Sequence, residues 1–254
     1  MTILLSTLLT FFFLSFPALT AHKGIQLLER DGVWYYPFHK APLHGRVVVW
    51  YENGQMKSRH TYKDGKQSGR WTDWYDNGQK KLDTRYKDGQ QDGPWTEWYT
   101  NGKKKGKRTY KDGKRNGRWR EWYESGQKQS DGSYKDGQQD GLWTYWYEDE
   151  QKEREETHRD GKFDGRFTTW YESGQKQSDG SYKDGQQDGL WTYWYEDGWK
   201  QLKGTYKGGT KDGQWTLWEN NGNFIKRMFK DGKITVFPLS LLDESICDAP
   251  CLLD

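Results

Sequence analysis

The residues best suited to binding chemistry are basic side chains gathered in one short stretch of the chain. Residues 103–120 contain ten Lys or Arg and a single acidic residue, Asp112. Such a positive field attracts phosphate and carboxylate groups, with an affinity that falls as the salt concentration rises. A solvated surface that keeps the protein soluble is an equally good interpretation. The candidate basic patch comprises Lys103, Lys104, Lys105, Lys107, Arg108, Arg115, Arg118 and Arg120.

A second stretch, between residues 148 and 160, has the opposite sign. Its acidic side chains outnumber Lys152, Arg154 and Arg159. This stretch is either a distinct binding surface or a segment that has simply decayed, and decay is slightly favoured. The candidate acidic unit comprises Glu148, Asp149, Glu150, Glu153, Glu155 and Glu156.

Residue types that hold metals or act in catalysis are scattered. The five His residues show no metal-ligand spacing, and the sequence has neither a phosphate-binding glycine loop nor a nucleophile elbow. Acidic pairs such as Asp88 and Asp92 lack the ligand spacing of a calcium loop, so we interpret them as turn residues that bond to their own backbone. We therefore expect a non-enzymatic protein without a metal or a cofactor.

Both cysteines lie near the end of the chain, in the segment Cys247-Asp-Ala-Pro-Cys251. In an oxidising compartment the simplest interpretation is a local disulfide between Cys247 and Cys251, or bonds to a partner. A metal or redox pair is less favoured, because two thiols without a third ligand do not complete a metal site.

The first 21 residues indicate export. Residues 3–21 are uncharged and mostly apolar, with Pro17 and small residues before His22 and Lys23, which is typical of a signal peptide. We expect a periplasmic or extracellular protein. The alternative is an uncleaved segment that anchors the chain in a membrane, because a run of this length could just span a bilayer.

The composition excludes the common enzyme folds. Between Tyr51 and Gly222 the chain has no Ala, Val or Ile, whereas parallel sheets and helix bundles need aliphatic strands or stripes. The mean hydropathy of −1.23 and the 30% charged residues would suggest disorder, but 17% of the residues are aromatic. We therefore expect a folded protein whose core consists of rings.

A 24-residue period organises the chain. The pair Trp50-Tyr51 recurs at steps of 24 residues, and a glycine, a tyrosine and Asp-Gly pairs recur in phase with it. Residues 122–149 and 170–197 are identical, which indicates a duplicated block of two repeats. The recurring pairs begin at Trp50, Trp74, Trp98, Trp122, Trp146, Trp170 and Trp194.

Each period predicts one β-hairpin. Residues 70–75 and 80–86 are expected to be strands, joined by a tight Asn-Gly turn at residues 76–79, because Asn and Gly tolerate positive φ. The Lys-Asp-Gly stretch returns the chain to the next hairpin. About eight hairpins would form an all-β, elongated, single-layer antiparallel meander, with stacked rings as its core.

The expected parts of the chain are a signal peptide at 1–21, a degenerate N-terminal repeat or cap at 22–49, tandem repeats at 50–232, and a capping strand with a Cys-containing tail at 233–254. In the acidic repeat, Glu150 replaces the turn glycine and His158 replaces the tyrosine. A side chain at a position with positive φ costs about 1 kcal/mol, so we expect this hairpin to be the loosest.

Units of this form, such as Trp74-Tyr75-Asp-Asn-Gly78-Gln followed by Tyr86-Lys-Asp-Gly, resemble the MORN repeat variant. The resemblance covers residues 29–232 and is closest to bacterial, antitoxin-like members. It implies a repeat scaffold that binds proteins or phospholipids or dimerises, and it brings no catalytic residue.

The function that we expect is an exported interaction scaffold that presents its sheet to a protein partner. The alternatives are an antitoxin or immunity protein that neutralises a toxin, and binding of anionic lipid or glycan through the basic patch. Self-association through the sheet edge or face is a further option, and nucleic acid is an unlikely partner for an exported protein.

Overall fold

The computed structural model describes residues 26–219 and 222–235. The predicted signal peptide (1–21), Cys247, Cys251 and most of the predicted C-terminal tail lie outside the described residues. The chain divides into two compact units between Gly102 and Lys103, and each unit is described by itself. This division lies inside the array that the sequence presents as continuous.

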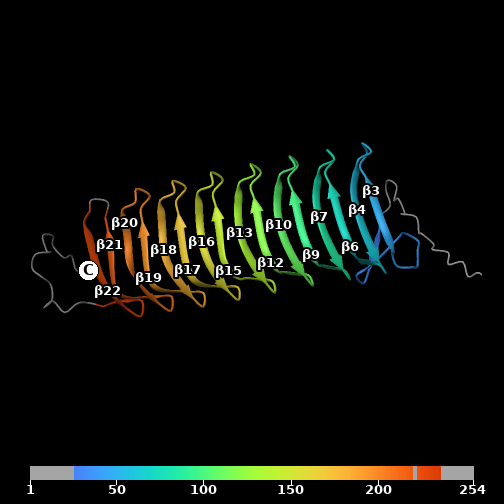
Figure 1. Ribbon diagram of the computed structural model, residues 1–254. Coiled ribbons are helices and arrows are strands. Elements are labelled where there is room, and N and C mark those ends of the chain that lie inside the picture. Colours follow the sequence, from blue (N-terminus) through green and yellow to red (C-terminus); the bar gives the residue numbers. More distant parts are fainter. Residues whose placement is uncertain (1–25, 220–221, 236–254) are drawn as a thin grey trace, which may run out of the picture. The chain divides into compact units, whose positions relative to one another are not determined.

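The first unit combines a small hairpin with the first repeats. Neighbouring strands pair antiparallel, in the order of the chain (Figure 1). The strands are β1 (Leu28–Arg30), β2 (Val33–Tyr35), β3 (Gly45–Trp50), β4 (Met56–Lys63), β5 (Lys66–Gln67), β6 (Gly69–Trp74), β7 (Lys80–Lys87), β8 (Gln90–Gln91) and β9 (Gly93–Trp98).

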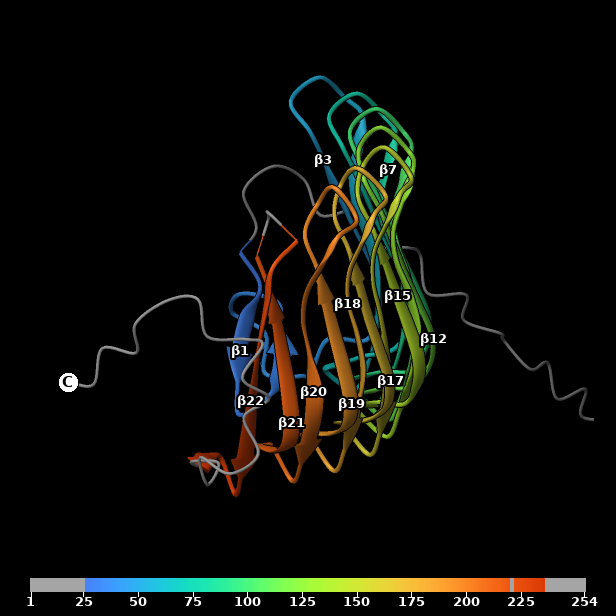
Figure 2. The same ribbon diagram turned by 90° about the vertical axis from the view of Figure 1, so that its left-hand side faces the viewer.

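The second unit is a longer run of the same hairpins, and its strands bend along their length (Figure 2). Its first strands are β10 (Lys104–Lys111), β11 (Lys114–Arg115), β12 (Gly117–Trp122), β13 (Lys128–Lys135), β14 (Gln138–Gln139) and β15 (Gly141–Trp146). They are followed by β16 (Lys152–Arg159), β17 (Lys162–Trp170), β18 (Lys176–Lys183), β19 (Gln186–Trp194), β20 (Lys200–Lys207), β21 (Thr210–Trp218), β22 (Phe224–Lys230) and β23 (Lys233–Thr235).

The all-β class and the antiparallel hairpin repeats are confirmed, and the strands of the described residues begin and end within a residue or two of the predicted positions. The predicted capping strand begins at Lys233 as β23, which pairs with β22. Near the start of the described residues, Leu43 packs with Val47, Tyr62 and Trp71 in one buried cluster.

The turns differ from the expectation. The two-residue turn of the repeats is the Asp-Gly pair, replaced by Gly208-Gly209 between β20 and β21. Asp64 and Gly65, for example, both have positive φ, at 51° and 75°, between the paired residues Lys63 and Lys66. That combination is typical of a type I′ hairpin turn. The Asp therefore contributes to the turn through its left-handed backbone conformation.

The turn after the Trp-Tyr pair at residues 74 and 75 lies where it was predicted, but only the glycine of its Asn-Gly pair has a positive φ. In the turn at residues 76–79, Gly78 has a positive φ of 82°. The strand that leads into this turn has a β-bulge, seen as a register shift between Asp73 and Trp74. Asn77 stabilises this turn, since its Oδ1 accepts a hydrogen bond from the backbone N–H of Gln79 at 3.0 Å. Because of this bulge, the alternation of side chains between the two faces of the sheet shifts by one residue.

The Trp-Tyr period has a direct structural cause. The hydroxyl of each tyrosine in the pair donates to the backbone carbonyl of the tryptophan one repeat later, as from Tyr123 to Trp146 at 2.8 Å and from Tyr171 to Trp194 at 2.9 Å. A buried hydroxyl of this kind satisfies a carbonyl at the end of the next strand. The two residues joined by this hydrogen bond are 23 positions apart in the sequence, so the bond recurs with the 24-residue period.

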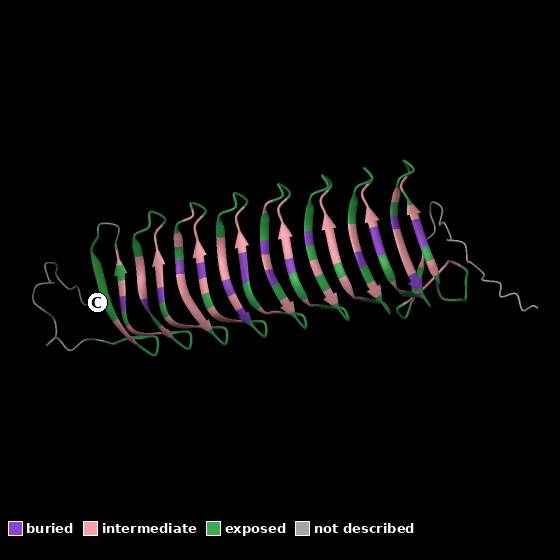
Figure 3. Ribbon diagram, viewed as in Figure 1, coloured by how far each residue is buried: buried purple, intermediate pink, exposed green. Residues whose placement is uncertain are grey.

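The core is a ladder of rings on one face of each sheet, which we call the ladder face. In the second unit Trp143 and Trp191 are buried, and Tyr134 and Tyr182 meet them edge to face at centroid distances of 5.1 and 5.2 Å. Each indole N–H donates to the preceding strand, as from Trp143 Nε1 to Ser133 O at 3.0 Å. Buried residues consequently lie within the strands, while the turns are exposed (Figure 3).

Glycines on the ladder face make room for these indoles. Gly132, Gly180 and Gly204 lie beneath Trp143, Trp191 and Trp215, and an added Cβ would come within 2.1–2.2 Å of a ring carbon. The glycines are therefore required by close packing on the ring, since their φ angles are not positive.

Candidate binding surfaces

The opposite face of the sheet carries lysine side chains that lie over tryptophan rings, and we call it the lysine face. In the second unit Lys128 Nζ lies 5.2 Å from the ring centroid of Trp146 and 3.3 Å from Asp131. Lys176, Trp194 and Asp179 repeat this arrangement, at 5.5 Å for the ring and 3.5 Å for the carboxylate. Cation–π contacts and ion pairs of this exposed kind are each worth about 1 kcal/mol or less.

The structure divides the basic patch between the two faces. Arg108 belongs to the ladder face, where its guanidinium lies 4.5 Å from the Trp119 ring centroid and 2.6 Å from Glu121. Arg115 also covers Trp119, at 4.7 Å, and donates to the Tyr134 hydroxyl. These two arginines are used within the fold.

Arg118 and Arg120 lie on the lysine face and share one carboxylate. Arg118 donates two hydrogen bonds to Asp131, at 3.0 and 2.9 Å, and Arg120 Nε lies 3.7 Å from the same group. Burial raises the pKa of Asp131, but hydrogen bonds from Arg118 and Lys128 lower it by more, so the pKa of this carboxyl is below its usual value. Asp131 thus offsets part of the positive charge that the sequence places here.

The remaining members of the basic patch are lysines on or beside β10. Lys103 donates from Nζ to the Ser125 carbonyl at 2.5 Å, and Lys104, Lys105 and Lys107 lie on β10 itself. Lys107 occupies the position at which the neighbouring hairpin has Asp131, so the lysine face is locally more basic here. Lys107 and Arg108 are consecutive on β10 and therefore lie on opposite faces of the sheet.

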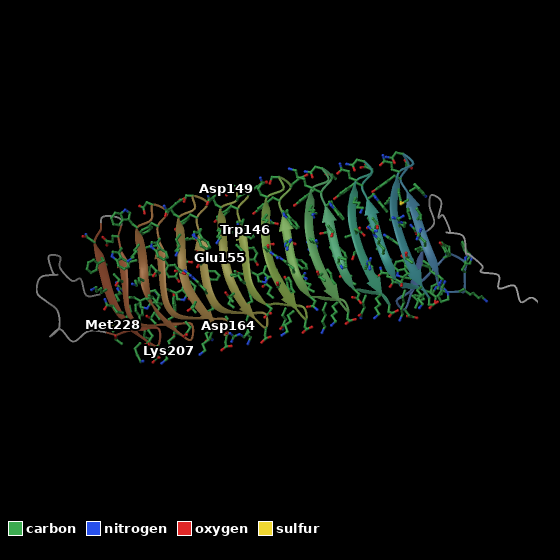
Figure 4. All side chains as sticks on the ribbon, in the orientation of Figure 1. Trp146, Asp149, Glu155, Asp164, Lys207 and Met228 are labelled. Carbon is green, nitrogen blue, oxygen red and sulfur yellow. The ribbon has the colours of Figure 1, made fainter. Side chains whose placement is uncertain are left out.

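The acidic unit is also spread over different places. Glu148, Asp149 and Glu150 lie in the turn before β16, and Asp149 is far from Glu155 along the strand direction (Figure 4). Glu155 lies on the lysine face and pairs with Lys152 at 2.6 Å. Glu150 has a φ of 74°, which confirms that a non-glycine residue takes the left-handed conformation at this turn.

Glu156 lies on the ladder face and is nearly inaccessible, with 2% exposure. His158 Nε2 is 2.9 Å from one of its carboxylate oxygens, and Arg154 Nε is 2.7 Å from the other. Arg154 in turn lies over the Tyr145 ring at 4.3 Å. We call Tyr145, Arg154, Glu156 and His158 the polar cluster.

The polar cluster is a site that the charge count alone does not reveal. Burial, with a contribution from the Glu156 carboxylate, raises the pKa of Tyr145 to about 12, so this hydroxyl keeps its proton. The signal in the sequence is the alternation Arg154-x-Glu156-x-His158, which places all three side chains on one face of a strand. The cluster holds opposite charges in a buried position, and it is a packing element.

A row of equivalent positions on the lysine face alternates between charged and apolar side chains. The row consists of Arg118, Leu142, Arg166 and Leu190, each 24 residues after the last, and we call it the alternating row. Leu142 is 58% exposed and Leu190 55% exposed, although both lie in strands. Arg166 is bound to Asp179 as Arg118 is to Asp131.

Within residues 26–219 and 222–235, no group of three or more His, Cys, Asp or Glu is placed to hold a metal ion. No helix in the same residues is long and apolar enough to cross a membrane.

Five segments of the chain match the family model of the MORN repeat variant: residues 43–64, 91–112, 115–136, 163–184 and 187–207. Strand β16, which carries the polar cluster, lies between two of these matches and outside both. No curated protein matches the chain.

Proposed function

We propose that this chain, a MORN-repeat protein by its five matching segments, is a non-enzymatic scaffold that binds a protein partner through the lysine face. The observation that carries the proposal is the alternating row. Leu142 and Leu190 are both more than half exposed on strands, beside arginines that are paired with carboxylates, and apolar groups rimmed by charge occur in protein interfaces.

The geometry of the row suits a partner of mixed character. Equivalent positions in neighbouring hairpins are two strands apart, or about 10 Å, so Leu142 and Leu190 lie about 20 Å from each other. Arg118 and Arg166 stand beside them with their guanidinium groups already oriented by Asp131 and Asp179. Preorganised arginines and apolar anchors are the residues that contribute most to binding energy in interfaces.

The test exchanges the two residue types within the row. Leu142→Arg installs the residue that the neighbouring repeats have at this position, so the fold should be kept. Crosslinking in the producing cells, followed by mass spectrometry, should recover a specific partner with the wild-type chain and about tenfold less of it with Leu142→Arg. Gln138→Arg, an exposed change on the short strand β14, is the control and should keep the partner.

Equal recovery with Leu142→Arg and the wild type would contradict a role of the row. The same experiment addresses the immunity alternative, which would be supported if the partner recovered is a toxin. We place the protein outside the cytoplasm because of the apolar run at residues 3–21; N-terminal sequencing of the mature chain should begin near residue 22.

Binding of anionic lipid or glycan through the basic patch is less well supported. Arg108, Arg118 and Arg120 are engaged with Glu121 or Asp131, which leaves a smaller positive surface than the sequence suggests. If anionic lipid bound here, replacing Lys104, Lys105 and Lys107 with Glu would abolish binding to anionic vesicles; unchanged binding would contradict this alternative.

A further inference from the structure

One turn of the second unit breaks the repeat in a way that creates a surface. At the position after the turn, one repeat has Lys103 and most have a glutamine: Gln55, Gln79, Gln127, Gln151 and Gln175. The side chain can lie over the turn glycine of the following hairpin, as Gln151 does at Gly174. Trp199 occupies this position near the end of the array and is 73% exposed. A large apolar ring is not favoured in water, so the exposed indole of Trp199 is available for contact with a ligand.

Trp199 lies at the edge of a cavity of about 630 Å³. Three tryptophans line it, Trp194, Trp199 and Trp218, together with Lys200 and Glu219. A cavity of a few hundred Å³ with aromatic walls and a small number of charged groups is typical of a site for a small organic ligand.

A second cavity of about 360 Å³ adjoins the first, since Lys200 and Trp218 line both. Its other lining residues include Leu190, Phe224, Lys203 and Lys226. The two cavities together bring three indoles and three lysines to the last hairpins. Lys176 lies over the ring of Trp194 and Lys200 over that of Trp218, at 5.5 and 5.9 Å.

The charges of this region depart from the pattern of the lysine face. Lys128, Lys152 and Lys176 each pair with an acidic residue three positions later, at 3.3, 2.6 and 3.5 Å. Lys200 has Lys203 at that position instead. A periodic ion pair is thus replaced by two like charges, which favours an anion from solution.

We propose that these two cavities form a binding site for an acidic oligosaccharide. The flat faces of sugar rings, which are rich in C–H groups, stack on the indoles, while carboxylate or sulfate groups on the sugar meet Lys200, Lys203 and Lys226. The spacing also fits, because equivalent positions in neighbouring hairpins are about 10 Å apart, which is comparable to the length of a disaccharide. This site goes beyond the proposed partner surface.

The composition of the site separates this ligand from simpler ones. A small inorganic anion would need the lysines but not three tryptophans. A neutral sugar would need the tryptophans but not a lysine in place of the usual acid. Leu190 belongs both to this site and to the alternating row, so the variants that test the site leave Leu190 unchanged.

The test uses the full chain and substitutions that the protein already has in other repeats. Trp199→Gln and Lys203→Asp restore the residues at the equivalent positions 175 and 179, so both variants should fold as the wild type does by circular dichroism and thermal unfolding. Isothermal titration with a galacturonic acid hexasaccharide, a sulfated heparin hexasaccharide and neutral maltohexaose gives the affinities. We expect one of the acidic probes to bind, and each variant to weaken it by about tenfold or more.

Lys107→Asp is the matched control, because it makes the same change at the equivalent position of the basic patch and should leave the affinity unchanged. The proposal is overturned if neither acidic hexasaccharide binds, if maltohexaose binds as tightly as the acidic probes, or if Lys107→Asp weakens binding and Lys203→Asp does not. It is also overturned if vesicles of phosphatidylglycerol bind in a Trp199-dependent way while the sugars do not. Loss of the sugar with Trp199→Gln but retention of the protein partner would separate this site from the proposed function.

Discussion

The hairpins around Gly132, Gly180 and Gly204 and the hairpin around Glu156 fill one position of the ladder face in opposite ways. In the first group the glycine leaves room for an indole, and Trp143, Trp191 and Trp215 lie directly upon it. In the second, Glu156 fills the space, and the smaller Phe167 pairs with it on the next strand. In these hairpins glycine is combined with the large indole, and the larger glutamate is combined with the smaller phenyl ring.

Two further repeats show what else the position accepts. His60 stacks on Trp71 at 3.8 Å with an angle of 7° between the rings, and Arg108 lies over Trp119 at 4.5 Å. Each also meets a carboxylate from the next hairpin, Asp73 at 2.7 Å and Glu121 at 2.6 Å. The position therefore also accepts a flat side chain whose charge is paired, as in His60 and Arg108, and a small one, since Thr84 is buried at the equivalent place.

The largest expected effect comes from removing the buried carboxylate. Glu156→Ala leaves His158 and Arg154 without their partner and should lower the free energy of unfolding by about 3 kcal/mol, measured by urea unfolding. Replacing the whole set, Arg154→Ser, Glu156→Gly, His158→Tyr and Phe167→Trp, recreates the glycine pattern and should recover most of the loss. If the combined variant is no more stable than Glu156→Ala, the two arrangements are not alternatives.

The converse change should be costly in a glycine hairpin. Gly180→Ala places a methyl group 2.2 Å from Trp191 Cδ2, so the ring must move, and we expect a loss of about 2 kcal/mol in the free energy of unfolding. Gly106→Ala is the control, because its methyl would meet the end of a long side chain, that of Arg108 at 3.1 Å, and not a rigid ring. Equal effects of the two variants would show that loss of glycine itself, and not the indole, sets the cost.

A smaller effect concerns the turn of the acidic hairpin. Glu150→Gly relieves a side chain held at a φ of 74° and should raise the free energy of unfolding by about 1 kcal/mol. The reciprocal variant Gly54→Glu introduces the same strain at a φ of 83° with no contact nearby, and should lose a similar amount. No gain with Glu150→Gly would show that this hairpin is not the loosest of the array.

The smallest effect compares a surface carboxylate with the buried one. The pKa of Asp131 is lowered in the folded protein, so its stabilisation is present above the unfolded-state pKa of about 3.9 and is lost as the pH falls through the folded value. Asp131→Asn should flatten the loss of stability below about pH 4, in thermal unfolding measured from pH 7 to pH 2. Asp179→Asn should do the same, since the pKa of Asp179 is lowered in the same way. Curves parallel to the wild type would contradict the role of these pairs.

Much of the fold can be predicted from the sequence, because every repeat states the same pattern. The Trp-Tyr pairs and the Asp-Gly pairs locate the strands and turns to within a residue or two. The face on which a side chain lies is harder, because the bulge between Asp73 and Trp74 shifts the alternation by one residue. Glu156 and His158 are assigned to a charged surface and a decayed repeat for this reason, although they meet inside the ladder.

Only part of the candidate surfaces can be predicted from the sequence. A count of charges finds the region around residues 103–120, but Arg118 and Asp131 are 13 residues apart and meet only because β12 and β13 pair. Trp199 breaks a visible period, yet its cavity depends on Trp194 and Trp218 from strands on either side. Contacts between strands of this kind have no local signature.

By itself the sequence determined the architecture of this protein. Its 24-residue period, its ring-rich strands and its Asp-Gly pairs leave antiparallel hairpins as the structure that can bury enough surface. The tertiary structure alone decided which charges are available: Glu156 is enclosed, Arg118 is bound to Asp131, and Arg108 is bound to Glu121. The physical reason is that the field around a side chain is set by neighbours across the sheet, which the order of residues along one strand does not specify.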